Sequence, residues 1–374
     1  MTQNEGKPKR RISRRDFIKY ATATAGVTAA GFALYNSVST GIGDNSTAIA
    51  TGSQHGHPST AAALAQTEGG ISPMEFLTDY YRGEVNSMTG EREYTLTAVN
   101  ANVSVARGIS FPAWAFAGPN GATVPGPTLR CLQGENLRIN FVNGSSHPHT
   151  IHLHGIHPAL ADGVFEVLDP GKRYEYAFEA DPFGVFLYHC HVMPVKKHIS
   201  KGLYGAFIVD PADPPLGLGP RPQADREFVM VMNGFDVDFD NENDFYTANG
   251  IANYYFENPI TLKVGELVRI YLVNMTEFDP VNSFHLHGNM FRLFRTGTRF
   301  NPSAVLDRTK PLGTAVREWL YSDQFAEVTD NVFLGQGERA VLEFVPRHTG
   351  RFLFHAHQSE FIELGWTGLF NVIS

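Results

Sequence analysis

The sequence predicts an all-β fold of two Greek-key β-sandwich domains. Its 374 residues are enough for two hydrophobic cores, and its 36 glycines and 22 prolines suit a chain with many turns. Short alternating or aromatic-rich runs, such as residues 94–99 and 174–178, lie between these turns. No long stretch has a helical period, and similar blocks recur at a domain-sized interval, which indicates duplication of one β domain.

Residues 1–50 are expected to be an export signal that does not belong to the fold. Residues 13–19, Ser-Arg-Arg-Asp-Phe-Ile-Lys, resemble a twin-arginine motif, and an alanine-rich stretch follows to about Val38. That stretch is short for a membrane span. We therefore expect export by the twin-arginine route to the periplasm or the cell exterior, with either cleavage or an uncleaved membrane anchor.

The rest of the chain divides into a flexible lead-in and two domains. We expect the lead-in at 51–85, because the sequence there is rich in small and polar residues. The first domain is expected at 86–212 and the second at 225–374, joined by a proline-rich linker. The formal net charge is -8 and there is no basic stripe, so nucleic acid is not an expected partner.

Each domain carries the same blocks in the same order. Residues 127–143 resemble residues 260–274, and each block precedes a His-Leu-His-Gly motif. Residues 184–191 resemble residues 350–357, and each of these ends in His-x-His. The repeat predicts that corresponding motifs occupy corresponding places in the two domains.

The most informative pattern is His-x-His, which each of the two domains carries twice at corresponding places of the repeat. The pairs are His152/His154, His189/His191, His285/His287 and His355/His357. Side chains alternate between the faces of a strand, so both imidazoles of a pair face one side. Eight imidazoles from four strands can surround a cluster of metal ions. Cys190, between two of these histidines, adds a thiolate to the set, and these donor types predict a copper protein.

The chain has two cysteines, Cys131 and Cys190. An exported protein could join them in a disulfide. A thiolate ligand cannot also be in a bridge, so the position of Cys190 argues against that pairing. Cys131 lies in an apolar strand pattern and is expected to be a small buried residue.

These motifs, in this order over about residues 90–374, resemble the multicopper oxidase family, specifically its small two-domain, laccase-like branch. The resemblance implies cupredoxin-like domains that hold four copper ions per chain: one type 1, one type 2 and two type 3. His149, Cys190 and His198 would bind the blue, type 1 copper, with His147 as an alternative to His149. Leu203 holds the axial position of the family, and Met193 is the competing axial ligand.

The second domain is expected to have no blue copper of its own. Asn282 stands where the first domain has His149, and Ala356 stands where it has Cys190. Neither side chain can replace the lost ligand. The resemblance therefore implies one blue copper per chain.

The resemblance assigns the eight histidines of the four His-x-His pairs named above to a trinuclear cluster. The first histidine of each His-Leu-His-Gly, His152 and His285, would bind the type 2 copper. Six others would bind the type 3 pair: His154, His189, His191, His287, His355 and His357.

Reduction of O2 to water also requires protons, and two carboxylates are candidates for their delivery. Asp162 follows the first His-Leu-His-Gly, although Asp162-Gly163 equally fits a turn. Glu360 follows His357, although it also fits a plain surface carboxylate. His157 is a candidate for orienting a ligand, with a structural histidine as the alternative.

The resemblance implies a laccase-like oxidase that takes single electrons from a phenolic, aromatic or metal-ion donor and reduces O2. It also implies a homotrimer in which each cluster lies between the first domain of one chain and the second domain of the next. A copper nitrite reductase is the nearest alternative, because it shares this plan but needs only one further copper. A copper-storage or electron-carrier protein is the non-enzymatic alternative. The acidic segment 236–244 is interpreted as a solvated loop, and its carboxylates are candidates for contact with a metal-ion donor.

Overall fold

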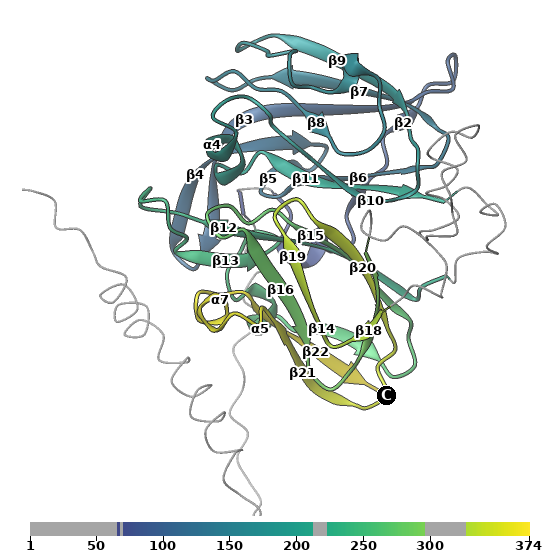
Figure 1. Cartoon of the computed structure of the whole chain (residues 1–374), viewed down its shortest axis with the longest axis vertical. Coiled ribbons are helices and arrows are strands. Elements are labelled where there is room, and N and C mark those ends of the chain that lie inside the picture. The colour runs from purple at the N-terminus through teal and green to yellow at the C-terminus, as the bar shows by residue number, and fades with distance from the viewer. Residues whose placement is uncertain (1–65, 68–69, 212–222, 296–326) are drawn as a thin grey trace, which may run out of the picture. The chain divides into compact units, whose positions relative to one another are not determined.

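The computed structural model describes residues 66–67, 70–211, 223–295 and 327–374 (Figure 1). The predicted export signal and residues 212–222 of the predicted linker lie outside the described residues. No helix in the described ranges is both long enough and apolar enough to cross a membrane.

The end of the predicted flexible lead-in is ordered. Residues 70–85 contain a short helix and two short strands: α3 (Pro73–Phe76), β1 (Tyr80–Tyr81) and β2 (Glu84–Val85). Ser72 caps α3 in a capping box with Glu75. Phe76 and Leu77 are buried, and this burial fastens a segment whose polar composition alone suggested flexibility.

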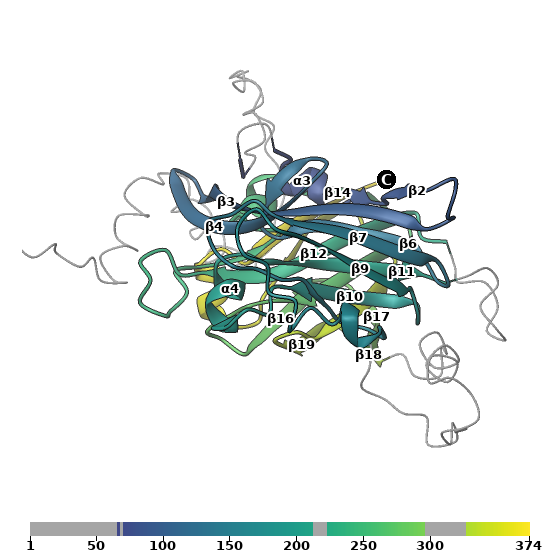
Figure 2. The same cartoon turned by 90° about the horizontal axis from the view of Figure 1, so that it is seen from above.

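The first domain is a sandwich of a five-stranded and a six-stranded sheet. The five-stranded sheet has the order β1-β6-β11-β10-β8, which adds β6 (Gly126–Leu132), β8 (His152–Leu153), β10 (Gly184–His189) and β11 (Tyr204–Asp210). The six-stranded sheet has the order β5-β4-β3-β7-β9, with β2 on β3, and adds β3 (Arg92–Ala106), β4 (Ile109–Gly118), β5 (Gly121–Thr123), β7 (Asn136–Asn143) and β9 (Arg173–Glu179). Figure 2 shows β3, β7 and β9 running side by side. Two short helices lie in its loops, η1 (Ala159–Ala161) and α4 (Val195–Ser200).

The second domain repeats this plan. Its six-stranded sheet has the order β13-β12-β15-β20-β17-β18 and contains β12 (Arg226–Phe235), β13 (Phe245–Ala248), β15 (Val268–Asn274), β17 (Phe291–Arg295), β18 (Glu327–Thr329) and β20 (Arg339–Phe344). Its five-stranded sheet has the order β14-β22-β21-β16-β19 and contains β14 (Ile260–Lys263), β16 (Val281–Leu286), β19 (Asn331–Gly335), β21 (Gly350–His355) and β22 (Thr367–Ile373). The helices α5 (Tyr254–Glu257) and α7 (Ser359–Glu363) lie in its loops.

Each sandwich encloses its own buried apolar cluster, and the predicted fold of two cupredoxin-like β-sandwiches is confirmed. The alternation in residues 94–99 is the buried-exposed pattern of β3, with Tyr94, Leu96 and Ala98 facing the first core. Cys131 lies in the same core as a free thiol, as expected. Burial raises the pKa of Cys131, so this thiol stays protonated.

A largely buried network of charges joins strands of the two domains. The Arg130 guanidinium donates to Asp210 at 2.7 Å and to Glu227 at 2.8 Å. Arg269 donates to Glu227 at 2.7 Å and to Glu343 at 2.6 Å. Glu227 therefore lies between two guanidinium groups. Burial alone would raise its pKa, but the two arginines outweigh burial and lower the pKa of Glu227 to about 2.

Glu227→Gln is expected to lower the free energy of unfolding by about 3 kcal/mol, because two buried guanidinium groups lose their shared anion. The contribution of Glu227 should be fully present above its ordinary pKa of 4.5 and should be lost as the pH falls toward about 2. Urea unfolding at pH 7 and pH 3 measures both effects. Glu257→Gln is the control, because its ion pair with Arg107 is exposed and should change stability by less than about 0.5 kcal/mol. Equal effects of the two substitutions would contradict this account.

Candidate metal centre

Three predicted ligands of the type 1 copper come together in the first domain. The Nδ1 atoms of His149 and His198 lie 3.2 Å apart. The Cys190 sulfur lies 3.2 Å from Nδ1 of His198 and 3.8 Å from Nδ1 of His149. Cys190 follows β10, His198 is on α4, and His149 is held by an isolated antiparallel bridge to Leu168.

The chemistry of this donor set fits a copper ion of the blue type. Burial lowers the pKa of His149 to about 3 and that of His198 to about 4, so both imidazoles are neutral and can ligate. Two imidazoles and one thiolate in a buried site are the ligands that type 1 copper takes. Burial raises the pKa of the free Cys190 thiol, and the backbone amide of Thr150 lies against its sulfur at 3.4 Å. A bound cation would favour loss of the thiol proton.

The two predicted axial ligands of the type 1 copper differ in burial. Leu203 is fully buried in the same apolar cluster as Cys190, and its carbonyl accepts the Cys190 amide at 3.0 Å. Met193 is 78% exposed, which disfavours it as a ligand of a buried ion. His147, the alternative to His149, is also exposed, and its Nδ1 lies 3.0 Å from the Ser146 hydroxyl.

Four further histidines of the first domain form one group, here named the first-domain histidine group. His152 on β8 pairs with His189 on β10 across the sheet, and Nε2 of His154 lies 3.2 Å from Nε2 of His189. The ring of His191 lies 5.3 Å from that of His152. Burial lowers the pKa of His154 to about 3 and that of His189 to about 4, which keeps both rings neutral.

Backbone carbonyls orient this group for binding through Nε2. Nδ1 of His152 lies 2.6 Å from the carbonyl oxygen of Asp162, and Nδ1 of His189 lies 3.0 Å from that of Cys190. The carboxylate of Asp162 lies 3.4 Å from Nδ1 of His152. Nε2 of His157 is 2.9 Å from the Leu153 carbonyl, so His157 braces the loop beside the group.

The second domain repeats the arrangement in a second-domain histidine group. His285 on β16 pairs with His355 on β21, and Nε2 of His287 lies 3.0 Å from Nε2 of His355. Nδ1 of His285 lies 2.8 Å from the carbonyl of Asp330, as His152 does from Asp162. The ring of His357 lies 5.2 Å from that of His285. Burial lowers the pKa of His355 to about 4.

Sequence reasoning missed one pair of hydroxyl groups that position the last histidine of each group. The Thr150 hydroxyl accepts the backbone amide of His191 at 3.1 Å, and the Ser283 hydroxyl accepts that of His357 at 2.7 Å. Each hydroxyl stands two residues before the first histidine of a His-Leu-His-Gly. This shared spacing was the available signal.

In both domains the same backbone hydrogen bonds hold the loop that follows the second His-x-His strand, β10 in the first domain and β21 in the second. In the first domain the amide of Cys190 donates to the carbonyl of Leu203, and the amide of Leu203 donates to the carbonyl of His198. The second domain has the same bonds at three corresponding positions: Ala356, Trp366 and Phe361.

Apolar and amide side chains fill the place in the second domain where the first has its type 1 site. Trp366 is fully buried, and its indole N–H donates to the Ser283 carbonyl at 3.0 Å. The Asn282 amide donates to the Thr276 hydroxyl at 2.8 Å. Neither Ala356 nor the tryptophan offers a lone pair to a metal ion, so this place has lost its copper chemistry.

Of the two predicted proton-delivering carboxylates, Asp162 lies beside His152 of the first-domain histidine group. Glu360 is exposed on α7, at the position that corresponds to Lys197 on α4.

The acidic segment 236–244 is folded back on itself. The carboxylate of Asp236 accepts the amides of Asp240 at 3.1 Å and Asn241 at 2.9 Å.

The two histidine groups are separate within one chain. Across the described residues, they share no ring contact and no hydrogen bond, and their ligand atoms form distinct sets.

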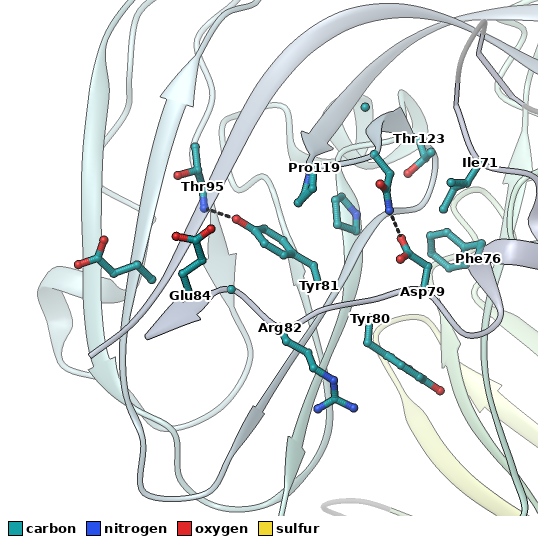
Figure 3. Close-up of a pocket in the computed structure, with 15 residues that line it drawn as sticks. Ile71, Phe76, Asp79, Tyr80, Tyr81, Arg82, Glu84, Thr95, Pro119 and Thr123 are labelled. Atoms are coloured by element: carbon teal, nitrogen blue, oxygen red, sulfur yellow. Dashed lines mark hydrogen bonds between the residues drawn. The ribbon is translucent and has the colours of Figure 1, made fainter. Parts of the chain in front are cut away.

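A cavity of about 450 Å³ lies elsewhere, beside Tyr81, Asp79 and Thr95 (Figure 3). Its lining contains none of the predicted copper ligands, so it is not the metal centre.

Comparison with known proteins links the fold and these sites to copper proteins. Profiles described as multicopper oxidase match residues 100–214 and residues 227–374. A solved structure described as a multicopper oxidase is 42% identical, covers 82% of this chain and 98% of its own, and superposes with a TM-score of 0.69.

Nitrite reductases are also among the relatives. The copper nitrite reductase from Nitrosomonas europaea is 25% identical, with 75% of this chain and 94% of its own covered, at a TM-score of 0.62. The copper-containing nitrite reductase of Neisseria gonorrhoeae is 28% identical over 215 residues, which are 52% of this chain and 52% of that protein. This chain thus spans about half the length of the curated relatives that it matches.

Proposed function

The chain belongs to the multicopper oxidase family, and we propose that it is a laccase-like oxidase, which oxidises a phenolic or metal-ion donor one electron at a time and reduces O2 to water. The observation that carries this proposal is the pair of facing imidazoles in each histidine group. These are His154 with His189 and His287 with His355. Two such pairs supply ligands for a binuclear copper site in addition to the ligands of a single type 2 ion.

The residues divide by role around the bound copper ions. His149, Cys190 and His198 would hold the type 1 copper, and the two histidine groups would together hold one type 2 and two type 3 ions. The metal would supply one-electron uptake at the first site and reduction of the acceptor at the second. The chain joins the two sites covalently, because Cys190 stands between two members of the first-domain histidine group. Asp162 is proposed to deliver protons beside His152.

Nitrite is the second candidate acceptor, favoured by the nitrite reductases among the relatives. A nitrite reductase with one type 2 copper would not need His191, the second histidine of each His-Leu-His-Gly, or His355 and His357 as a pair. This chain keeps all of these side chains, which favours the trinuclear proposal.

Copper analysis and two acceptor assays separate these functions. We expect about four copper ions per chain, consumption of O2 without release of peroxide when a phenol is the donor, and no nitric oxide from nitrite. Two ions per chain with nitric oxide from nitrite would replace the oxidase by a nitrite reductase. One ion per chain without either activity would point to an electron carrier.

We further propose that the two histidine groups meet between neighbouring chains of a ring. Exposed apolar side chains follow the ligands of both groups along the chain. Leu160, Phe165 and Val167 come after His154, Met290 comes after His287, and Phe333 pairs with Ser283 on the strand that carries His285. A head-to-tail contact that joins these two unlike patches closes into a ring, and a homotrimer is the expected assembly.

Light scattering after size exclusion is expected to give three times the 41.3 kDa chain mass, less any export signal that is removed. Phe165→Asp should dissociate the trimer and should remove the copper ions of the cluster but not the type 1 ion. Met88→Asp is the matched control, because this side chain is 90% exposed and lies far along the chain from both patches. A monomer that holds four copper ions would contradict the inter-chain arrangement.

Export by the twin-arginine route is proposed as the way to the periplasm or cell exterior.

A further inference from the structure

Trp114, on β4, lies between the protein surface and the type 1 ligands. Its ring centroid is 4.4 Å from that of His147, which is exposed. It is 4.8 Å from the ring of His198 and 5.3 Å from the ring of His149. Trp114 itself is 7% exposed. An aromatic molecule stacked on His147 would therefore be one tryptophan away from both copper-binding imidazoles.

A cation lies over the Trp114 ring of this stack. Lys197, the residue before His198, is exposed, and its ammonium nitrogen lies 5.4 Å from the Trp114 ring centroid. In the described part of the chain Lys197 has no salt bridge. The other lysines around α4 are engaged differently: Lys196 interacts with Glu277, and Lys201 donates to the Pro112 carbonyl at 2.6 Å.

We propose that Trp114, His147 and Lys197 form a donor platform that binds aromatic electron donors carrying a negative charge, such as phenols with a carboxylate or sulfonate group. The aromatic ring stacks on His147, with Trp114 buried behind it, and the anionic group faces the Lys197 ammonium. This inference rests on the proposed function and names the class of its donor. The chain as a whole is acidic, with a net charge of -8, so the local cation at this place attracts an anionic donor against the overall charge of the chain.

The observations favour a small donor over an acidic protein. A stable protein interface needs about 800 Å² on each partner. The surface around the platform does not offer a basic face of that size, because acidic groups of the second domain, Glu277 and Asp236, lie beside Lys196 and Lys201. One exposed imidazole backed by a buried indole, with one cation over the indole, matches a single substituted ring.

The electron balance of the step is simple. The phenolic donor loses one electron, and a type 1 copper held by His149, Cys190 and His198 would be its one-electron acceptor. The phenolic O–H bond breaks, and its proton passes to water. The product is a phenoxyl radical that keeps its anionic substituent.

Binding can be measured without copper chemistry. The probes are 2-naphthalenesulfonate and the neutral 2-naphthamide, titrated calorimetrically into the copper-free full chain. We expect Lys197→Gln to weaken sulfonate binding about fivefold and to leave the neutral probe within about twofold. His147→Ala should weaken both probes, because it removes the stacking surface. Lys263→Gln, an exposed lysine on β14 of the second domain, removes the same charge and should change neither.

A second readout follows reduction of the blue absorbance in the absence of O2 and nitrite. A sulfonated phenol should reduce the copper-loaded protein more slowly after Lys197→Gln, and rising salt should remove the difference. A neutral phenol should be unaffected. Because no terminal acceptor is present, these results are independent of whether O2 or nitrite is the acceptor.

Three results would overturn the donor platform. One is equal binding of both probes to the unaltered chain. Another is an equal loss with Lys263→Gln, which would indicate a diffuse charge effect. The third is a reduction that depends on Lys197 with an acidic donor protein but not with the sulfonated phenol.

Discussion

Cys190→Ser is expected to abolish the blue colour and to lower the rate of donor oxidation by at least about 1000-fold, because a serine oxygen does not replace the thiolate that type 1 copper requires. The sulfur lies 3.2 Å and 3.8 Å from the two imidazole nitrogens, so its loss removes one of three ligands. The two histidine groups keep all their side chains. We therefore expect the copper content to fall by about one ion per chain, as measured by absorbance near 600 nm and by metal analysis.

The chain supplies a matched control for this experiment. Cys131 is the other cysteine, and it is buried in the core of the same domain without a disulfide. Cys131→Ser should keep the blue colour and donor oxidation, with at most some loss of stability from the buried hydroxyl. If Cys190→Ser lost every copper ion, the division into a separate type 1 site and a cluster would be wrong.

His287→Ala is expected to eliminate O2 consumption, by at least about 100-fold, while the blue copper stays reducible by a donor. Nε2 of His287 faces Nε2 of His355 at 3.0 Å in the second-domain histidine group. The ring is partly exposed in the single chain, so its removal should cost little folding stability. Oxygen-electrode rates, together with the rate of bleaching of the blue band without O2, separate loss of the acceptor site from loss of electron entry.

His348→Ala tests whether removal of any exposed histidine has the same effect. His348 is exposed in the second domain and belongs to none of the ligand sets, so O2 consumption should be unchanged. Retention of full O2 consumption in His287→Ala would contradict the trinuclear proposal, because it would show that the ring of His287 is not a ligand of the O2-reducing site.

The parts of the site that could be predicted are those that depend on spacing along a strand. His152 and His154 share a face because strand residues alternate, and duplication carried the same argument to His285 and His287. The cross-strand pairs of His152 with His189 and of His285 with His355 then follow from the antiparallel pairing of short strands.

Features that depend on packing between distant segments could not be predicted. Trp114 reaches the type 1 ligands because β4 lies against the loop that carries α4, and the Trp114 amide donates to the Lys201 carbonyl at 2.8 Å. Nothing in the spacing of Trp114 and His198 indicates this contact. The exposure of Glu360, three residues after His357 on α7, likewise depends on packing and not on spacing. The end of the lead-in is ordered because Phe76 and Leu77 are buried, and its composition does not indicate this burial.

Trp366 also makes the asymmetry between the domains hard to reverse. A second blue centre would need His at 282, Cys at 356, His at 361 and a side chain much smaller than indole at 366, all together. The changes at 361 and 366, each made alone, would leave a buried polar group without a partner and a cavity, respectively, at a cost of about 1–5 kcal/mol each. Intermediate sequences would therefore be less stable and would gain no copper. Under the proposed function, each chain would therefore have one site of electron entry, in its first domain.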